Sequence, residues 1–173
     1  MGCEVDDQYW MKQALELAAE ASERNEVPVG AVVVLNDQIV GRGFNSPISG
    51  CDPSAHAEIQ ALRDAAKHLD NYRLVDATLY VTIEPCSMCA GAIVHSRIKR
   101  LVYGALEPKA GVATSQILFF DQPWLNHLVE VKGGILADEC SSMISEFFAR
   151  RRYEKRQSKL DGCVEGSNPE TQA

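Results

Sequence analysis

Cys86 and Cys89 form a C-x-x-C pair directly after Pro85. Three residues apart on a helix, two side chains share one face, with Cβ atoms roughly 5–6 Å apart. The first turn of a helix also stabilises thiolates, because its free N–H groups and positive dipole end favour negative charge. Zinc binds thiolates, but a C-x-x-C pair at a helix start is also typical of thioredoxin-like redox proteins. The pair alone therefore leaves a metal site and a redox site open.

The segment His56-Ala57-Glu58 favours the metal site. With His56 as third ligand, zinc keeps one position for a water, whose pKa falls to about 7. Glu58 would take the proton of this water and deliver it to a leaving group. Residues two apart do not share a helix face, so His56 and Glu58 can meet only around the end of a helix. The combined pattern H-x-E…P-C-x-x-C is the signature of zinc-dependent nucleobase deaminases.

The first half of the chain is predicted to form a helix, a hairpin and a second helix. Apolar residues at helical spacing predict an amphipathic helix over 7–24. Two β-rich segments, 29–35 and 38–44, predict a hairpin that turns at Asn36-Asp37. After a loop rich in Gly, Pro and Ser, Asp52 and Pro53 predict the N-cap and first position of a helix that ends near residue 69.

The second half is predicted to alternate strands and helices. Strands are expected at 78–83, 99–104 and 129–131, and helices at 85–96, 115–120 and from after Gly134 to about residue 155. The first strand–helix–strand unit implies a parallel, right-handed crossover. Helices on both faces of a mixed sheet of about five strands give a three-layer α/β/α domain over 1–159. Polar residues with Gly and Pro predict a disordered tail over 160–173.

Length and composition indicate one globular domain. The chain has 173 residues, of which 46% are hydrophobic and 24% charged, and no apolar run approaches the roughly 18 residues that span a bilayer. Acidic residues precede the first apolar stretch, which does not fit a signal peptide, so we expect a cytoplasmic protein without a membrane segment. Of the six cysteines, Cys140 is interpreted as a core residue. Cys51 is not expected to be a ligand, since catalytic zinc keeps one position open.

The basic residues are unevenly distributed. The net charge is −7, yet residues 150–159 hold six of the 17 Lys and Arg residues and a single acid. Such a segment is either a solvated helix end or a patch that contacts phosphates. Taken alone, the charges favour the solvated helix end.

Beyond the zinc motif, the chain resembles the bacterial tRNA-specific adenosine deaminases from about residue 9 to residue 156. The resemblance is carried by EVPVGAVVV, GFNSPI, DPSAHAEIQALR, NYRLVDATLYVTIEPCSMCAGAIVHSRIKRLVYGA, GILADEC and FFARRR. The zinc motif by itself fits cytidine, guanine and riboflavin-pathway deaminases equally well. The resemblance implies a cytidine deaminase-like fold with one Zn²⁺ per subunit. It also implies hydrolysis of adenosine to inosine at the wobble position, the first anticodon position, of a tRNA.

The resemblance also implies substrate-binding residues and partners. Asn45 matches the residue that contacts the target nucleotide, and the backbone around Ala57 would help to read the base edge. Family members are homodimers, in which the partner helps to shape a groove for the tRNA anticodon stem-loop. Their terminal helix touches the anticodon loop, and the matching residues here are Phe147, Phe148, Arg151 and Arg152. Aromatic rings beside arginines suit a splayed single-stranded loop.

One loop departs from the family pattern. This chain has Glu107 where the family usually has Asp, and the following KAGVATSQ differs from the expected run of small residues. Because this loop contacts RNA in the family, Glu107 and Lys109 are RNA-binding candidates.

Three alternatives to a tRNA deaminase remain open. A deaminase of free guanine, cytosine or a nucleoside would use the same zinc chemistry, although the basic terminal helix opposes it. A zinc-stabilised binding module would have no use for Glu58. A thiol redox protein predicts a reversible Cys86–Cys89 disulfide and no bound metal.

Overall fold

Five strands form one mixed sheet. They are β1 (Gly30–Leu35), β2 (Gln38–Phe44), β3 (Thr78–Ile83), β4 (Arg100–Ala105) and β5 (Glu130–Lys132). The computed structural model describes residues 3–164, with side chains for residues 7–160. The strands lie in the order β2-β1-β3-β4-β5. β1 is antiparallel to β2 and β3, whereas β3, β4 and β5 are parallel.

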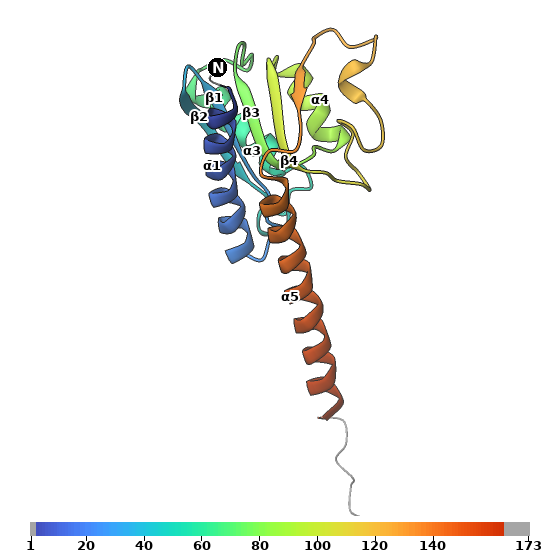
Figure 1. Cartoon of the computed structure of the whole chain (residues 1–173). Coiled ribbons are helices and arrows are strands. Elements are labelled where there is room, and N and C mark those ends of the chain that lie inside the picture. The colour runs from blue at the N-terminus through green and yellow to red at the C-terminus, as the bar shows by residue number, and fades with distance from the viewer. Residues whose placement is uncertain (1–2, 165–173) are drawn as a thin grey trace, which may run out of the picture.

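Helices cover both faces of this sheet (Figure 1). One face is covered by α1 (Cys3–Glu23) and the first turns of α5 (Ala137–Val164), the other by α3 (Ala57–His68) and α4 (Ser87–His95). Two short helices, α2 (Pro47–Gly50) and η1 (Phe119–Asp121), lie in the loops. The predicted three-layer α/β/α architecture is therefore confirmed, as is the parallel crossover from β3 through α4 to β4. Every helix within the described residues is too short or too polar to cross a bilayer.

The sheet separates two apolar clusters. Ala31 and Val33 of β1 pack in the cluster on the side of α3 and α4, and Val32 and Val34 pack in the cluster on the side of α1 and α5. A strand buried on both faces needs a continuous apolar run, and GAVVVL provides one. The predicted hairpin turn is also present, since Asn36 and Asp37 both have left-handed backbone angles, as a type I′ turn requires.

Several helices differ from the prediction. α1 begins at Cys3 rather than at residue 7, and the helix predicted over 115–120 is only the short η1 at Phe119–Asp121. α3 begins at Ala57 rather than at Pro53, because the Asp52 carboxylate accepts hydrogen bonds from the N–H and hydroxyl of Ser54 and closes a turn there. α5 continues to Val164, so residues 160–164 of the predicted tail are helical. The remaining residues of that tail, 165–173, lie outside the described part of the chain.

Candidate metal centre

His56, Cys86 and Cys89 lie together at the N-terminal ends of α3 and α4. His56 and Cys86 are the N-cap residues of these helices, and Cys89 is in the first turn of α4. His56 Nδ1 lies 3.7 Å from Cys86 Sγ and 3.6 Å from Cys89 Sγ. Tetrahedral zinc, with bonds of about 2.3 Å to sulfur and about 2.1 Å to nitrogen, holds such atoms roughly 3.6 Å apart. The three side chains therefore have the spacing of a zinc site.

The thiol chemistry of the cluster also fits a cation. A hydrogen bond from Cys89, with the His56 ring nearby, lowers the pKa of Cys86 to about 4. The interaction with Cys86, followed by burial, raises the pKa of Cys89 well above its usual range. Two adjacent thiols resist double deprotonation unless a positive ion lies between them. One imidazole and two thiols within 4.8 Å of one another are a ligand set that zinc prefers.

Glu58 faces this cluster from the first turn of α3. Its side chain is 3% exposed, and its carboxyl group interacts with the Cys89 thiol. Burial, together with the nearby charge of Cys86, raises the pKa of Glu58 to about 7. Because His56 is the N-cap and lies outside the regular helix, it can reach the site that Glu58 faces. The predicted arrangement around a helix end is thus present.

Asn45 and Ala57, the predicted substrate-binding residues, are in contact. Asn45 follows β2 directly, and its Oδ1 accepts the N–H of Ala57 at 2.9 Å. The backbone of the next residue is also held by a hydrogen bond, since the Ser46 N–H donates to the Ala55 carbonyl. Both residues therefore border the cluster next to His56.

Glu107 and Lys109 lie in the loop after β4. Lys109 is exposed, and its N–H donates to the Glu107 carboxylate at 3.0 Å. An isolated bridge pairs Gly111 with Cys86, so this loop runs beside the segment that carries the cysteine ligands. The loop that departs from the family pattern therefore adjoins the candidate metal centre.

The α5 candidates divide into buried and exposed residues. Phe148 is 42% exposed, and Arg151 and Arg152 are exposed, but Phe147 is only 6% exposed with the Arg150 guanidinium over its ring. Phe147 therefore offers little ring surface to a base, and its role as an RNA contact stays a prediction. Cys51 is exposed, and the described ligand cluster consists of His56, Cys86 and Cys89.

Two buried carboxylates near the site were not predicted from the sequence. Glu26 and Glu84 are 1% and 2% exposed. Burial alone would raise the pKa of Glu84, but hydrogen bonds from Ser115, Thr114 and Glu107 hold it below its usual value. The position of Glu84, directly after an apolar strand and before Pro85, is the signal that could have indicated it.

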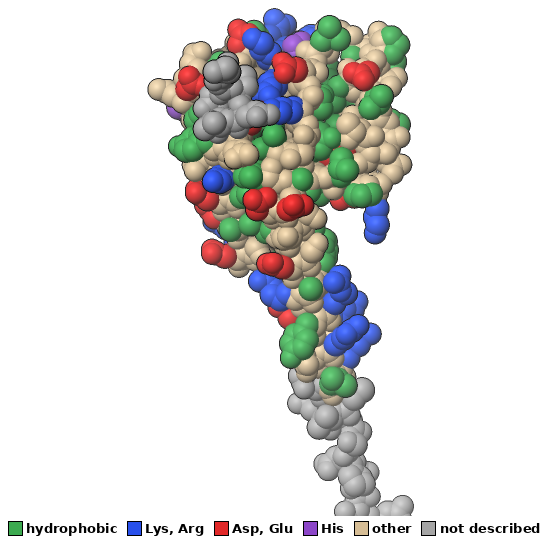
Figure 2. Space-filling model, in the orientation of Figure 1, with side chains coloured by type: hydrophobic (Ala, Val, Ile, Leu, Met, Phe, Trp, Pro, Cys, Tyr) green, Lys and Arg blue, Asp and Glu red, His purple; other side chains and the backbone are tan. Residues whose placement is uncertain are grey.

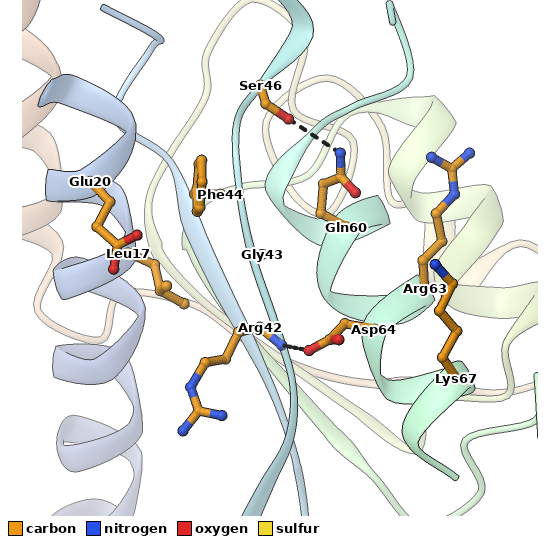
Figure 3. Close-up of a pocket in the computed structure, with 10 residues that line it drawn as sticks. All are labelled: Leu17, Glu20, Arg42, Gly43, Phe44, Ser46, Gln60, Arg63, Asp64 and Lys67. Carbon is orange, nitrogen blue, oxygen red and sulfur yellow. Dashed lines mark hydrogen bonds between the residues drawn. The ribbon is translucent and has the colours of Figure 1, made fainter. Parts of the chain in front are cut away.

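A cavity of about 700 Å³ lies beside β2, between α1 and α3 (Figure 3). It is lined by Leu17, Glu20, Arg42, Gly43, Phe44, Ser46, Gln60, Arg63, Asp64 and Lys67. Gln60 donates to the Ser46 hydroxyl, and the Arg42 N–H donates to the Asp64 carboxylate. The lining mixes both signs of charge and includes none of the zinc-ligand candidates, so this cavity is separate from the metal centre.

Comparison with known proteins identifies the family. Residues 4–105 match the model of the cytidine and deoxycytidylate deaminase zinc-binding region. A tRNA-specific adenosine deaminase from Haemophilus influenzae is 54% identical over 154 residues, which cover 88% of this chain and 89% of that protein. The chain belongs to the tRNA-specific adenosine deaminase family. The resemblance inferred from the sequence is thereby confirmed.

Solved structures agree with the family and its fold. A structure from studies of A-to-I editing by tRNA deaminases at the wobble position is 44% identical, with a TM-score of 0.76, and the match covers 78% of this chain and 98% of that one. A guanine deaminase from Nitrosomonas europaea is 25% identical, with a TM-score of 0.70 and coverage of 82% and 84%. Like other tRNA-specific adenosine deaminases, this chain therefore has the expected cytidine deaminase-like fold.

Proposed function

We propose that this chain hydrolyses adenosine to inosine at the wobble position of tRNA. Water adds its oxygen at C6 of adenine, the bond from C6 to the amino nitrogen breaks, and ammonia leaves. The observation that carries the proposal is a His-Cys-Cys cluster at zinc spacing beside a buried glutamate, in a chain 54% identical to a tRNA-specific adenosine deaminase.

The geometry of the centre supports a role for each of its residues. His56, Cys86 and Cys89 would hold one zinc ion per subunit, which would supply the Lewis acidity that lowers the pKa of the attacking water. Glu58 moves the protons: its carboxylate accepts one from the water and delivers one to the departing amino nitrogen. The burial of Glu58 keeps bulk water from competing for these protons.

Asn45 and Ala57 are proposed to hold the target nucleotide. The Oδ1 of Asn45 is engaged by the Ala57 N–H, so the polar group that Asn45 has left for a ligand is its NH₂ donor. We assign this donor to the nucleotide whose base is attacked. The backbone at Ala57, next to both His56 and Glu58, lies where the edge of a flipped adenine would be read.

The projecting part of α5 is proposed to contact RNA. The helix projects below the domain (Figure 1), and Lys and Arg side chains gather along it (Figure 2). Phe148, Arg152, Lys155 and Lys159 are exposed and spaced i, i+4, i+7 and i+11, which places them on one face of the helix. This stripe spans roughly 17 Å at 1.5 Å per residue. An exposed ring within a basic stripe suits the anticodon stem-loop, where bases are stacked and phosphates neutralised. Arg151, Glu107 and Lys109 would add contacts on either side.

The proposal extends to assembly and location. We infer a homodimer, as the resemblance implies, and the test is the molar mass in solution by light scattering. A cytoplasmic location follows from the substrate, and it also suits two thiol ligands that must stay reduced to bind metal.

The decisive experiment is incubation with total bacterial tRNA, followed by sequencing for adenosine-to-inosine changes. Changes confined to the wobble position of an anticodon loop are the expected result. The structural likeness to a guanine deaminase makes a free-base deaminase the second candidate. Turnover of free guanine or adenosine that is comparable and insensitive to Arg151→Ala and Arg152→Ala would favour that candidate instead.

A further inference from the structure

Glu84 occupies the junction between the sheet and the candidate metal centre. It follows β3 directly, it precedes Pro85 and the ligand Cys86, and its side chain is 2% exposed. A carboxylate is rarely buried to this extent unless its lone pairs are satisfied. The identity of its partners therefore indicates what the residue does.

These partners come from both ends of one loop, residues 106–116. Glu84 Oε1 accepts the N–H groups of Thr114 at 2.7 Å and Ser115 at 2.9 Å. Glu84 Oε2 accepts the N–H of Glu107 at 3.0 Å and the hydroxyl of Ser115. The Thr114 hydroxyl also donates to Oε1, at 3.5 Å. A single carboxylate thus closes the loop, and three of its five donors belong to the main chain.

The loop is folded tightly over this carboxylate. A Cβ at Gly111 would lie 2.4 Å from the Glu84 carboxyl carbon, so only glycine fits. The Val112 N–H donates to the Pro85 carbonyl at 3.0 Å, and Gly111 pairs with Cys86. The loop is therefore in register with the segment that carries the cysteine ligands.

We infer that Glu84 is a positioning residue, whose carboxylate holds the 106–116 loop, with Glu107 and Lys109 at its exposed end, in place to receive RNA beside the metal centre. The role in RNA binding rests on the proposed function. Because three of the donors are main-chain N–H groups, most side chains of the loop can change while the loop keeps its place. This accounts for a loop whose sequence departs from the family pattern next to an intact set of zinc ligands.

Glu26 holds the loop on the other side of the site in the same manner. Its side chain is 1% exposed, and its carboxylate accepts the N–H groups of Ser49 at 2.7 Å and Ile48 at 3.3 Å. These residues belong to α2, which follows Asn45 closely. Buried carboxylates that accept backbone N–H groups are thus a recurrent way in which this domain fixes its loops.

The test is Glu84→Gln, which keeps the size of the side chain. The amide oxygen of the glutamine can still accept from Thr114 and Ser115. Its NH₂ group, however, faces the Glu107 N–H, and two donors cannot form a hydrogen bond with each other. We expect KM for an anticodon stem-loop RNA with wobble adenosine to rise about tenfold, with kcat and zinc content near wild type. Amide hydrogen exchange over 106–116 should accelerate in the RNA-free protein.

Asp7→Asn is the matched control. Asp7 is also buried, but its partner Arg100 begins β4, at the end of that strand opposite the loop. This variant should lower the melting temperature without changing KM or loop exchange. If Glu84→Gln does not fold, Ser115→Ala removes one donor and should shift KM and exchange in the same direction by less.

Two results would overturn the inference. One is wild-type exchange and KM in Glu84→Gln, and the other is a joint loss of zinc and kcat, which would make Glu84 a support of the metal ligands. Failure of the proposed function is distinguishable, because the wild-type protein would then edit no RNA. Hydrogen exchange would still test whether Glu84 holds the loop.

Discussion

At the scale of single residues, the centre depends on two N-cap positions. An N-cap side chain ordinarily accepts a hydrogen bond from a free N–H of its own helix. Neither His56 nor Cys86 makes such a bond. At α3, the Asn45 side chain accepts a hydrogen bond from the Ala57 N–H, which the His56 side chain leaves free. The cap side chains are thereby available for a metal, while the positive end of each helix still favours thiolate and carboxylate at the centre.

Glu58→Gln tests the proton-transfer role at this scale. The variant keeps the shape of a buried side chain but cannot carry the proton between water and leaving group. Because general acid–base catalysis contributes typically about 10²–10⁴-fold, kcat for inosine formation should fall by that factor. Zinc content, measured by metal analysis, should remain that of the wild type. Normal activity in a zinc-loaded Glu58→Gln variant would exclude the assigned mechanism.

At the scale of elements, local signals predicted the sheet better than they predicted the loops. Strands such as GAVVVL are recognisable because burial on both faces demands continuous apolar residues. The predicted start of α3 was wrong, because Asp52 and Pro53 match the local pattern of an N-cap followed by a first helical residue. The helix begins four residues later, at Ala57, whose N–H is bound by Asn45, twelve residues away in the sequence. The contacts of Glu84 with the 106–116 loop span up to 31 residues, and no sequence periodicity encodes them.

The packing of α3 on β2 makes Gly43→Ala a prediction about the site. A Cβ at Gly43 would lie 2.3 Å from the Ala57 carbonyl oxygen and 2.4 Å from the Ala61 nitrogen. The helix must then move away, at a cost of about 1–3 kcal/mol, and it carries His56 and Glu58 with it. Both the melting temperature and inosine formation should fall. Gly91→Ala, where the space is open in α4, should instead raise stability by about 0.5–1 kcal/mol.

Asp7 connects α1 to β4 and β5, and its titration should make the free energy of unfolding depend on pH in the acid range. Its carboxylate, 1% exposed, accepts from Arg100 at 2.7 and 2.9 Å and from Lys132 at 3.0 Å. Burial alone would raise its pKa, but these hydrogen bonds and that of Tyr80 lower it from 3.8 to about 2. A pKa that is lower in the folded state stabilises the fold above about pH 4, and this contribution, about 2 kcal/mol, is lost as pH falls to about 2.

Denaturant unfolding between pH 2 and pH 5 measures this contribution. Asp7→Asn has no carboxylate to titrate, so it should be less stable than the wild type at neutral pH. The two proteins should converge in stability as the wild-type carboxylate becomes protonated. Parallel pH profiles over this range would show that Asp7 is not the group responsible.

At the scale of the whole molecule, charge is separated between the domain and its last helix. The chain is acidic overall, with a net charge of −7, yet its α5 extends from the domain with a basic stripe (Figure 2). On the charges of the sequence alone, a solvated helix end is the favoured interpretation of this segment. The stripe from Phe148 to Lys159 favours the interpretation as a phosphate-binding surface. Among the described side chains of the projecting helix, the basic residues of this stripe lie on one face. The rest of the chain carries a net negative charge, so this basic helix would orient the tRNA as it binds.

Lys155→Ala combined with Lys159→Ala tests that orientation through salt dependence. Each phosphate contact contributes roughly 0.7–0.9 to the slope of log K against log salt, so the double variant should flatten the slope by roughly 1.4–1.8. Affinity for the anticodon stem-loop RNA should fall most at low salt, while kcat at saturating RNA stays unchanged because neither lysine reaches the metal centre. The matched control is Tyr153→Ala with Gln157→Ala on another face of α5, which should leave the slope intact. Equal slopes in all three proteins, measured by fluorescence anisotropy, would mean that the projecting helix is only a solvated end.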